Sequence, residues 1–312
     1  MISSDLRVGF IGAGRAAGAL AAGLSERGYP VPAVASRTHA SAAALAERIE
    51  GCKAVASAQR VAESCDIVFI TTPDAAIESV AREVDWPAGV GVAHCCGAES
   101  ASILDAARVQ GAPTGSFHPM QTFTQATRGT DCFAGVTFAI DGSPPLLDVL
   151  AEMARALGGR PVEVRPEHRA LYHLSGFLAC GLMTAQVGRA ADLWSVMGFT
   201  REQGLEALVP ILRGTVDSLE AQGLPGALTG PISRGDLGTV RKHLEAIESY
   251  APSLLPLYCE SALGAITLAV EKGGIDGAAE AALRALLEER RASAERVEEV
   301  TARSGAGAPI VG

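Results

Sequence analysis

The sequence has few positively charged residues and lacks the basic runs typical of nucleic-acid-binding proteins. Lysine and arginine number 26 against 35 aspartate and glutamate residues, for a net charge of −9, and no basic run or RNA-binding signature occurs. Phosphates would be repelled over most of such a surface, so we expect no nucleic-acid partner. Hydrophobic residues make up 48% and charged residues 20%, which is the composition of a soluble globular protein rather than a disordered or fibrous one.

The seven cysteines include no Cys-x-x-Cys pair, and their number is odd. This usage fits a reducing compartment better than a disulfide scaffold, so a cytoplasmic protein is expected. Cys95 and Cys96 are adjacent and point in different directions along a strand, which makes a poor metal clamp even with His94 and His118 nearby. We therefore expect no metal site.

No positively charged, apolar leader precedes the first strand pattern, so no signal peptide is expected. One uncharged run, 170–188, has nearly the length of a membrane span. It contains His173, Ser175 and three glycines, and such residues are costly against lipid unless they find partners. The run therefore predicts a helix buried inside protein, and we expect no membrane partner.

The chain is long enough for two domains, and its pattern changes near residue 164. In 1–164, short β-rich runs alternate with alanine-rich helical stretches, which is typical of a parallel sheet with helices on both faces. The pattern of 165–303 is helical, and 304–312 is predicted to be a flexible, glycine-rich tail. The predicted fold class is therefore α/β, a doubly wound, mostly parallel sheet followed by an all-α domain. The expected strands are 7–11, 31–35, 54–56, 67–71, 91–94, 114–117 and 137–140.

A glycine turn follows the first strand and leads into a helical pattern, which is the context that a dinucleotide fingerprint requires. Gly12 allows the tight turn, Gly14 lets a pyrophosphate approach the backbone, and Ala17 keeps the helix close to the strand. The helix N-terminus offers free N–H groups to the negative charge. The residues predicted to bind a dinucleotide here are Gly12, Ala13, Gly14, Arg15, Ala16 and Ala17.

The end of the second strand lacks the acidic residue that an NAD site usually places there to accept hydrogen bonds from the ribose hydroxyls. It carries Ser36, Arg37 and Thr38 instead. The guanidinium of Arg37 is a planar fork of donors suited to a phosphate, and the two hydroxyls can add hydrogen bonds. An ordinary surface arginine is the alternative. Together with the missing acid, these residues predict NADP(H) as the cofactor and count against a methyltransferase.

Three further strand ends carry polar residues at the edge where ligands bind in open parallel sheets. Aspartate at the end of the fourth strand could equally cap the next helix, and a single histidine is more often structural than catalytic. Two histidines at neighbouring strand ends leave a functional and a structural role equally open. The predicted cofactor contacts at this rim are Thr72, Pro73, Asp74 and His94, and His118 is a candidate proton donor.

The segment 228–244 interrupts the helical half with three glycines and a proline. Asp236 stands where it could cap the helix that follows. Capping by Asp236 does not explain why Arg234 is present. An arginine on a stiff, glycine-bounded loop is placed to bind an anionic group on a substrate or the cofactor. A surface salt bridge is the alternative. We expect this loop to close the active site, with Arg234 near His118 and Tyr172.

Seven stretches of the chain, taken in order, resemble the Rossmann-like proteins that carry a DUF2520 domain. The resemblance covers roughly residues 6–250, and its last motif is the most specific. That family looks like a relative of pyrroline-5-carboxylate reductase and of the 6-phosphogluconate dehydrogenase group. The resemblance implies an N-terminal NADP-binding domain, a C-terminal helical domain of the 6-phosphogluconate dehydrogenase type and usually a dimer. The stretches are GFIGAGRAAGAL, VASRT, FITTPDAAI, HCCGA, GSFHPMQTF, YHLSG and ALTGPISRGDLGTVRKHL.

The sequence departs from the family pattern at three positions. Members commonly have serine where Cys96 stands, and asparagine near Gly181 and Ser218. Asparagine amides at those places are suited to hold a substrate carbonyl or the nicotinamide amide. Their absence favours a second hypothesis, a regulatory or scaffold protein that binds NADP without turnover.

The histidines, Tyr172 and Arg234, which this sequence keeps, favour an NADPH-dependent reductase of a small C=O or C=N substrate. Substrates of the family are largely undefined, although some relatives are associated with ketopantoate reduction, so a ketopantoate-like keto acid or a cyclic imine is expected. The cofactor would supply the hydride, while the protein supplies orientation, a proton donor and charge stabilisation. The candidate catalytic residues are His118, Tyr172, His173 and Arg234, the last pairing with a substrate carboxylate.

A homodimer is also predicted, because the helices of 166–272 carry broad apolar faces that one short domain would struggle to cover. A self-contained bundle is the alternative. The side chains that suggest the dimer are Leu208, Ile211, Leu254, Leu255, Leu257 and Leu263.

Overall fold

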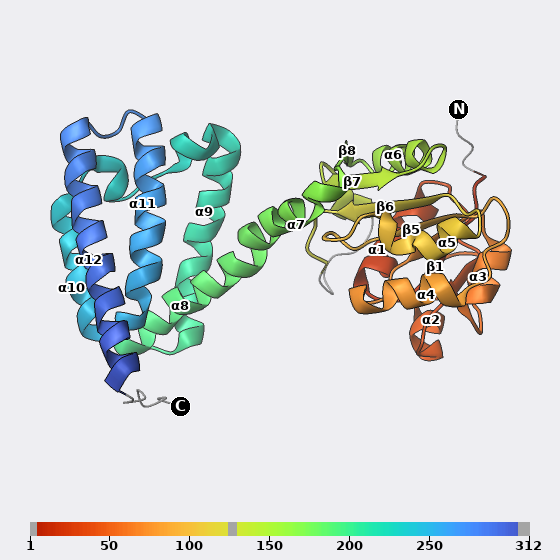
Figure 1. Cartoon of the computed structure of the whole chain (residues 1–312), viewed down its shortest axis with the longest axis horizontal. Helices are drawn as coiled ribbons and strands as arrows, with labels where there is room; N and C mark the ends of the chain where they lie inside the picture. The colour runs from red at the N-terminus through yellow and green to blue at the C-terminus, as the bar shows by residue number, and fades with distance from the viewer. Residues whose placement is uncertain (1–4, 124–129, 305–312) are drawn as a thin grey trace. The chain divides into compact units, whose positions relative to one another are not determined.

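The computed structural model describes residues 5–123 and 130–304, and the chain divides into two compact units, Met1–Met183 and Thr184–Gly312. The first unit contains a sheet flanked by helices, and the second is helical (Figure 1). The last strand ends at Glu163, and every later element is a helix. The compact units, however, divide inside the long helical stretch that follows. Residues 305–312 of the predicted tail lie outside the described residues.

Eight strands form one sheet in the order β3-β2-β1-β4-β5-β6-β7-β8. Neighbouring strands are parallel except β6 and β7, which are antiparallel. The strand order reverses beside β1, which confirms the predicted doubly wound, mostly parallel sheet and places its switch point at the glycine turn. The strands are β1 (Val8–Ile11), β2 (Ala33–Ala35), β3 (Lys53–Ala54), β4 (Ile67–Ile70), β5 (Gly91–His94), β6 (Thr114–Pro119), β7 (Thr137–Gly142) and β8 (Arg160–Glu163).

The eighth strand is absent from the sequence-based prediction, because it contains Pro161. Proline has no N–H and is rare inside sheets. Here β8 lies at the edge of the sheet and pairs with β7 alone, so the missing donor interrupts no ladder.

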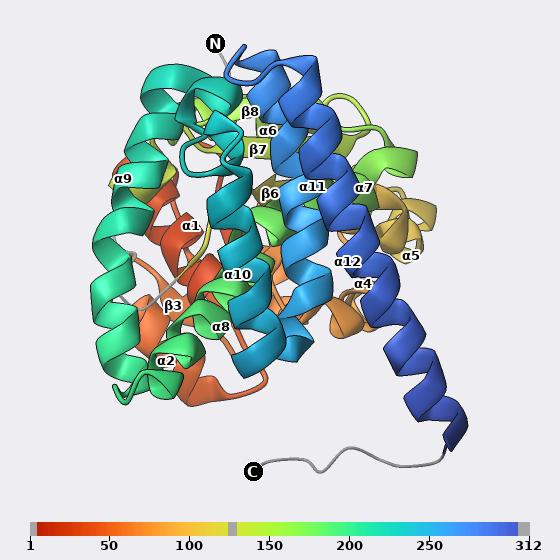
Figure 2. The ribbon, with the colours of Figure 1, turned by 90° about the vertical axis from the view of Figure 1, so that its left-hand side faces the viewer.

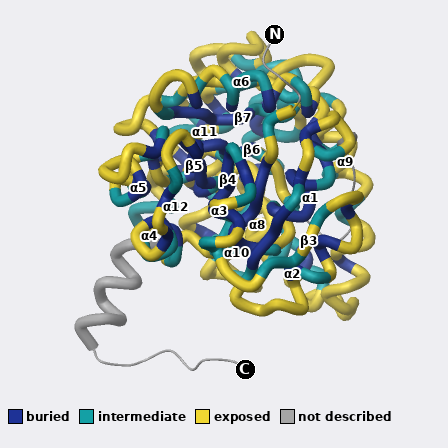
Figure 3. The backbone as a smooth tube through the Cα atoms, turned by 90° about the vertical axis from the view of Figure 1, so that its right-hand side faces the viewer, coloured by how far each residue is buried: buried dark blue, intermediate teal, exposed yellow. Residues whose placement is uncertain are grey.

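Two apolar cores pack against the sheet, one on each face. Strands β1, β4 and β5 are buried along their whole length, and the buried backbone is dark blue in Figure 3. Burial on both faces explains why these strands are continuous apolar runs in the sequence. On one face lie α1 (Arg15–Glu26), α2 (His39–Ala46) and α6 (Leu146–Ala156), and on the other α3 (Ala58–Ser64), α4 (Ile77–Glu83) and α5 (Asp105–Val109).

The core of the helical unit lies among three helices, α10, α11 and α12, which run side by side in Figures 1 and 2. The long α9 begins with a capping box: Thr200 Oγ1 accepts from the Gln203 N–H, and the Gln203 side chain accepts from the Thr200 N–H. The helices are α7 (Arg169–Phe177), the π-helical turn η5 (Leu178–Leu182), α8 (Met183–Val196), α9 (Arg201–Ala227), α10 (Leu237–Tyr250), α11 (Leu255–Glu271) and α12 (Gly277–Ser304).

The apolar run 170–188 corrects one prediction, because most of its residues are exposed rather than buried. Leu171 is 65% exposed and Phe177 is 49% exposed. The pattern predicted a helix covered by protein, whereas these side chains are exposed. Two helical stretches, Pro166–Val196 and Pro252–Glu271, are long and apolar enough to cross a membrane by length and composition, a test that core helices of soluble proteins also pass.

Candidate functional site

The two glycines of the turn after β1 have different surroundings. Gly12 has a φ of 115°, and a side chain there would lie 2.5 Å from the carbonyl oxygen of Thr71. Only glycine fits such a position. At Gly14, directly before α1, an added Cβ would meet nothing within 4 Å. The first N–H groups of a helix have no intrahelical acceptor, so this open space at the start of α1 is suited to a phosphate.

The other residues of the turn support the same geometry. Ala17 is fully buried against the core, which brings α1 close to the sheet as its predicted role requires. Arg15 is exposed, while Ala13 and Ala16 are half-buried. The turn is also tied to β4, since Thr71 Oγ1 donates to the Gly12 carbonyl at 3.1 Å.

Ser36, Arg37 and Thr38 directly follow β2, the neighbour of β1 in the sheet. Arg37 and Thr38 are exposed, and Ser36 is half-buried. Among the residues that the structure describes, the Arg37 guanidinium has no ion-pair partner. Its charge is therefore available to an anionic ligand.

At the end of β4, Thr72 is half-buried and its Oγ1 is buried without a hydrogen-bond partner in the described part of the chain. Pro73 and Asp74 are exposed. Asp74 is the first residue of a 3₁₀ turn whose N-cap is Pro73, so the alternative that Asp74 caps the helix is wrong. Instead, Asp74 interacts with Cys96: burial raises the pKa of this thiol, and a hydrogen bond with Asp74 raises it further. Asp74 thus faces the loop after β5.

His94, at the end of β5, is fully buried. Its Nδ1 accepts from the Cys96 N–H at 3.1 Å, and its Nε2 lies 2.9 Å from the Ser100 carbonyl oxygen. The ring therefore carries its proton on Nε2 and donates it to Ser100. Burial lowers the pKa of His94 to about 4, so the ring is neutral. With both ring nitrogens engaged inside the protein, His94 holds the loop 95–101, and its contact with the cofactor stays a prediction.

Three of the four candidate catalytic residues come together at the carboxyl end of the sheet. His118 Nδ1, in β6, lies 3.0 Å from the Tyr172 hydroxyl in α7. The same hydroxyl is 3.3 Å from the His118 carbonyl oxygen. The ring of His173 lies 6.1 Å from that of His118, centroid to centroid, and its side chain is exposed. Residues far apart in the sequence thus form one polar cluster.

The electrostatics keep the central pair of this cluster neutral. Burial, followed by the nearby positive charge of Arg169, lowers the pKa of His118 to about 4. Burial raises the pKa of Tyr172 to about 12. At neutral pH the imidazole therefore has one N–H and one acceptor, and the tyrosine keeps its O–H. The single hydroxyl proton of Tyr172 can go either to the His118 carbonyl oxygen or to Nδ1, and only the second arrangement leaves the ring proton of His118 on Nε2.

Arg169 is a member of this cluster that the sequence does not single out. It is 1% exposed, and its guanidinium carbon lies 5.7 Å from the centroid of the Tyr172 ring. Its spacing of three residues from Tyr172 on one helix was the available signal, because residues three apart share a face. Arginines on helices are so often surface residues that this spacing alone is weak.

The loop of Arg234 belongs to the helical unit and is held firmly there. Ser233 is buried, and Gly274 packs so closely that an added Cβ would lie 2.5 Å from the Ser233 carbonyl oxygen. Gly235 has a φ of 66°, and Asp236 caps α10 by accepting from the Thr239 N–H at 3.0 Å. Arg234 itself is exposed. Its approach to His118 and Tyr172 stays a prediction.

Gly181 lies in the π-helical turn η5, near the place where family members commonly have asparagine. An added Cβ there would lie 2.4 Å from Cε2 of Phe177. The aromatic ring therefore occupies the space that a longer side chain would need. Ser218, at the second such place, is half-buried in α9.

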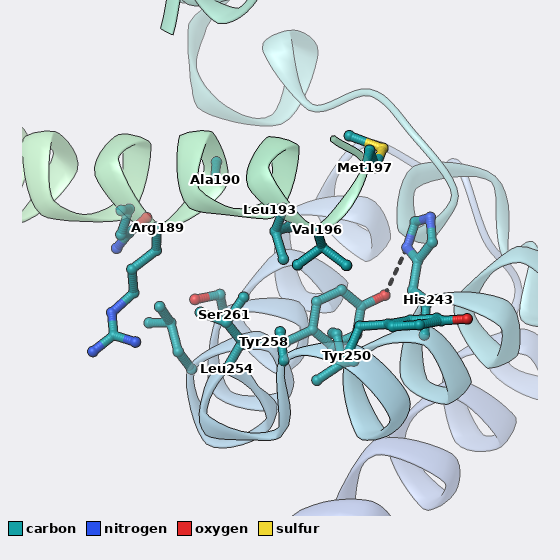
Figure 4. Close-up of a pocket in the computed structure, with 15 residues that line it drawn as sticks. Arg189, Ala190, Leu193, Val196, Met197, His243, Tyr250, Leu254, Tyr258 and Ser261 are labelled. Carbon is teal, nitrogen blue, oxygen red and sulfur yellow. Dashed lines mark hydrogen bonds between the residues drawn. The ribbon is translucent and has the colours of Figure 1, made fainter. Parts of the chain in front are cut away.

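A separate cavity of about 610 Å³ lies in the helical unit among α8, α10 and α11 (Figure 4). Its wall is mostly apolar and includes Leu193 and Val196. His243 Nδ1 lies 3.1 Å from the Tyr258 hydroxyl at one end, and Arg189 lies at the other. None of the residues predicted to bind cofactor or substrate lines this cavity.

Two family models match the chain. Residues 7–92 match the model described as NADP oxidoreductase coenzyme F420-dependent, and residues 136–265 match the domain of unknown function DUF2520. The chain carries a DUF2520 domain. The resemblance to DUF2520-domain proteins found in the sequence is thereby confirmed, and so is the predicted cofactor, NADP(H). No curated protein matches the chain.

Solved structures from several organisms share the fold of this chain. A putative NADP oxidoreductase from Bacteroides fragilis is 22% identical with a TM-score of 0.69, over 85% of this chain and 99% of its own. A Thermotoga maritima protein is 20% identical with a TM-score of 0.63, over 93% and 99%. A Plasmodium falciparum pyrroline carboxylate reductase with NADP bound is 14% identical with a TM-score of 0.56, over 87% and 98%. These matches confirm the predicted fold class.

Proposed function

We propose that this protein is an NADPH-dependent reductase of a small, anionic substrate that contains a C=O or C=N bond. The observation that carries the proposal is the neutral His118–Tyr172 pair, with 3.0 Å between Nδ1 and the hydroxyl, at the carboxyl end of the sheet that bears the glycine turn. The family match over residues 7–92 supports redox chemistry with NADP. The structural neighbour named as a pyrroline carboxylate reductase supports reduction at a C=N bond.

The described residues fit NADP(H) at three points. The open space at Gly14 leaves room for the pyrophosphate at the start of α1. Arg37, exposed at the end of β2, would hold the 2′-phosphate. The buried hydroxyl of Thr72 lacks a partner among the described residues and stands at the end of the neighbouring β4. A bound ligand would supply that partner.

When bound, NADPH supplies the hydride. His118 would supply the proton from Nε2 in the tautomer in which Tyr172 donates to Nδ1 rather than to the His118 carbonyl oxygen. Nε2 faces Gly97, where an added Cβ would lie 2.8 Å from it, so a side chain at this position would block that atom. His173 completes the polar wall beside the ring. Arg234, on its rigid loop, would pair with the carboxylate of the substrate.

The test is NADPH oxidation, followed at 340 nm, against a panel of 2-keto acids and cyclic imines. We expect turnover of at least one substrate, and His118→Ala should reduce kcat by roughly 10²- to 10⁴-fold, the range of a lost general acid. Tyr172→Phe should give a smaller loss. Calorimetry should show unchanged NADPH affinity in both variants. Turnover that survives His118→Ala would contradict the assignment of this residue.

A second candidate is an NADP-binding regulatory or scaffold protein without turnover. The observation that favours it is the contact of Phe177 with Gly181, which fills the place where an asparagine amide would stand. Tight NADPH binding without oxidation against the whole panel would favour this candidate over the reductase.

A further inference from the structure

We propose that Arg169 is a positioning residue of the reductase site: it holds the backbone on both sides of Gly97 and thereby fixes the orientation of the His118 ring. This inference rests on the proposed function only for its catalytic consequence. The orientation of the ring is a property of the protein alone and can be measured without substrate.

The first observation is the pair of backbone contacts that Arg169 makes. Its Nη2 donates to the Cys96 carbonyl at 3.1 Å, and its Nε donates to the Glu99 carbonyl at 3.0 Å. These two carbonyls flank Gly97 in the loop after β5. Two donors of one planar, buried guanidinium therefore fix the loop in distance and in direction.

The second observation is what the loop touches. An added Cβ on Gly97 would lie 2.7 Å from Cδ2 of His173 and 2.8 Å from Nε2 of His118. The backbone of Gly97 thus lies directly against both rings. A loop that shifted by a fraction of this distance would either push His118 away from Tyr172 or leave it free to rotate.

The third observation is that the same buried charge reaches the other partner of His118. The Arg169 guanidinium lies 5.7 Å from the centroid of the Tyr172 ring, within the range of a cation–π contact. Asp141, 3.8 Å from Arg169 Nε, accepts from the Ala101 N–H at 2.8 Å and so holds the far end of the loop. One buried pair therefore orders the loop and the tyrosine together.

A contribution to folding stability does not explain why the Arg169–Asp141 ion pair is buried. Arg169 is 1% exposed and Asp141 is 6% exposed, and each keeps one buried polar atom, Nη1 and Oδ2, without a hydrogen-bond partner in the part of the chain that is described. Replacing a buried ion pair with apolar residues of similar volume is often neutral or stabilising. Retaining an incompletely bonded pair is therefore better explained by what it positions.

The test compares Arg169→Lys with the wild type by ¹⁵N NMR of the histidine rings. Lysine keeps the charge beside Asp141, but one ammonium cannot reproduce the planar fork to Cys96 and Glu99. We expect the wild-type His118 ring to hold a single tautomer between pH 5 and 8, and the variant to populate both tautomers. With an active substrate, kcat should fall by about ten- to a hundredfold, as misplaced catalytic groups do, with NADPH affinity unchanged.

Arg165→Lys is the matched control, because Arg165 precedes the same helix and its side chain is 68% exposed. It should change neither the tautomer nor kcat. Should Arg169→Lys fold poorly, the double variant Arg169→Gln with Asp141→Asn removes both charges together and should give the same mixed tautomers. A variant that melts at lower temperature but keeps a single His118 tautomer would overturn the proposal. Absence of turnover in the wild type would overturn the proposed function and leave the NMR comparison intact.

Discussion

At the scale of single residues, His94 shows how burial changes the meaning of a histidine. Its position at a strand end suggests a ligand contact, but the folded chain engages both ring nitrogens with its own backbone. Arg169 shows the reverse, since a helical arginine with only a weak sequence signal is buried against two other segments, the loop after β5 and β7. Neither role can be predicted from the sequence, because each depends on backbone atoms that only the fold brings near.

The burial of His94 predicts how stability depends on pH. Its pKa in the folded protein is about 4, below the ordinary value of 6.5, so the unfolded chain binds the proton more readily. The stability that this ring contributes is present above pH 6.5 and is lost as pH falls toward 4, by up to about 3 kcal/mol. Urea denaturation between pH 7 and pH 4.5 should show a shallower decline for His94→Gln. An equal decline in both proteins would refute this.

Arg37 predicts the preference between the two nicotinamide cofactors. Because the residue is exposed at the end of β2, where no acid stands, it should bind the 2′-phosphate. Calorimetry should show tighter binding of NADPH than of NADH. Arg37→Ala should weaken the affinity for NADPH roughly ten- to a hundredfold, which is the expected effect of losing hydrogen bonds to a charged group. The exposed Arg60→Ala serves as control and should change neither affinity. Equal affinity of the wild type for both cofactors would contradict the assignment.

At the scale of elements, the sequence predicts what short-range patterns encode. Each of the seven expected strands overlaps an observed one, because most of them are short, buried apolar runs and the first ends in a glycine turn. Strand β3 (Lys53–Ala54) is the weakest match, since it is not buried and shares only residue 54 with the expected 54–56. Strand β8 escapes prediction because Pro161 is tolerated only at an edge, and edges are a property of the whole sheet. The burial of 170–188 was wrongly predicted for a similar reason, since a pattern shows that a helix face is apolar without showing what covers it.

The loop of Arg234 carries a prediction at this scale. The loop is held by close packing at Ser233, Gly235 and Gly274, while the Arg234 side chain is exposed. Arg234→Ala should therefore leave the melting temperature nearly unchanged and raise KM for an anionic substrate by roughly ten- to a hundredfold, as expected for a lost charge-assisted hydrogen bond. Arg241→Ala, an exposed arginine on α10, is the control. A lowered melting temperature with an unaltered KM would mark Arg234 as structural.

At the scale of the whole molecule, we propose a homodimer formed through the exposed apolar helix faces. Of the side chains that suggested it, Ile211 is 66% exposed and Leu257 is 37% exposed, while Leu255 is buried in the core of its own unit. Light scattering at micromolar concentration should give twice the mass of the chain. Ile211→Asp should shift the protein toward the monomer, because a charge would be buried at the interface. A wild-type chain that stays monomeric would rule out the dimer.

The edge strand β8 bears on how two copies can meet. The Arg160 N–H donates to the carbonyl of Val136, directly before β7, and the Val164 N–H, directly after β8, donates to the carbonyl of Ile140 in β7. The backbone nitrogen of residue 161, between them, therefore faces the open side of the sheet. There proline offers no donor, and the charged Arg160 and Glu163 flank it. The opposite edge, β3, is only two residues long and begins with Lys53. Both borders therefore resist the addition of a strand from another molecule, which disfavours edge-to-edge aggregation of the sheet and is consistent with the helix-mediated dimer proposed above.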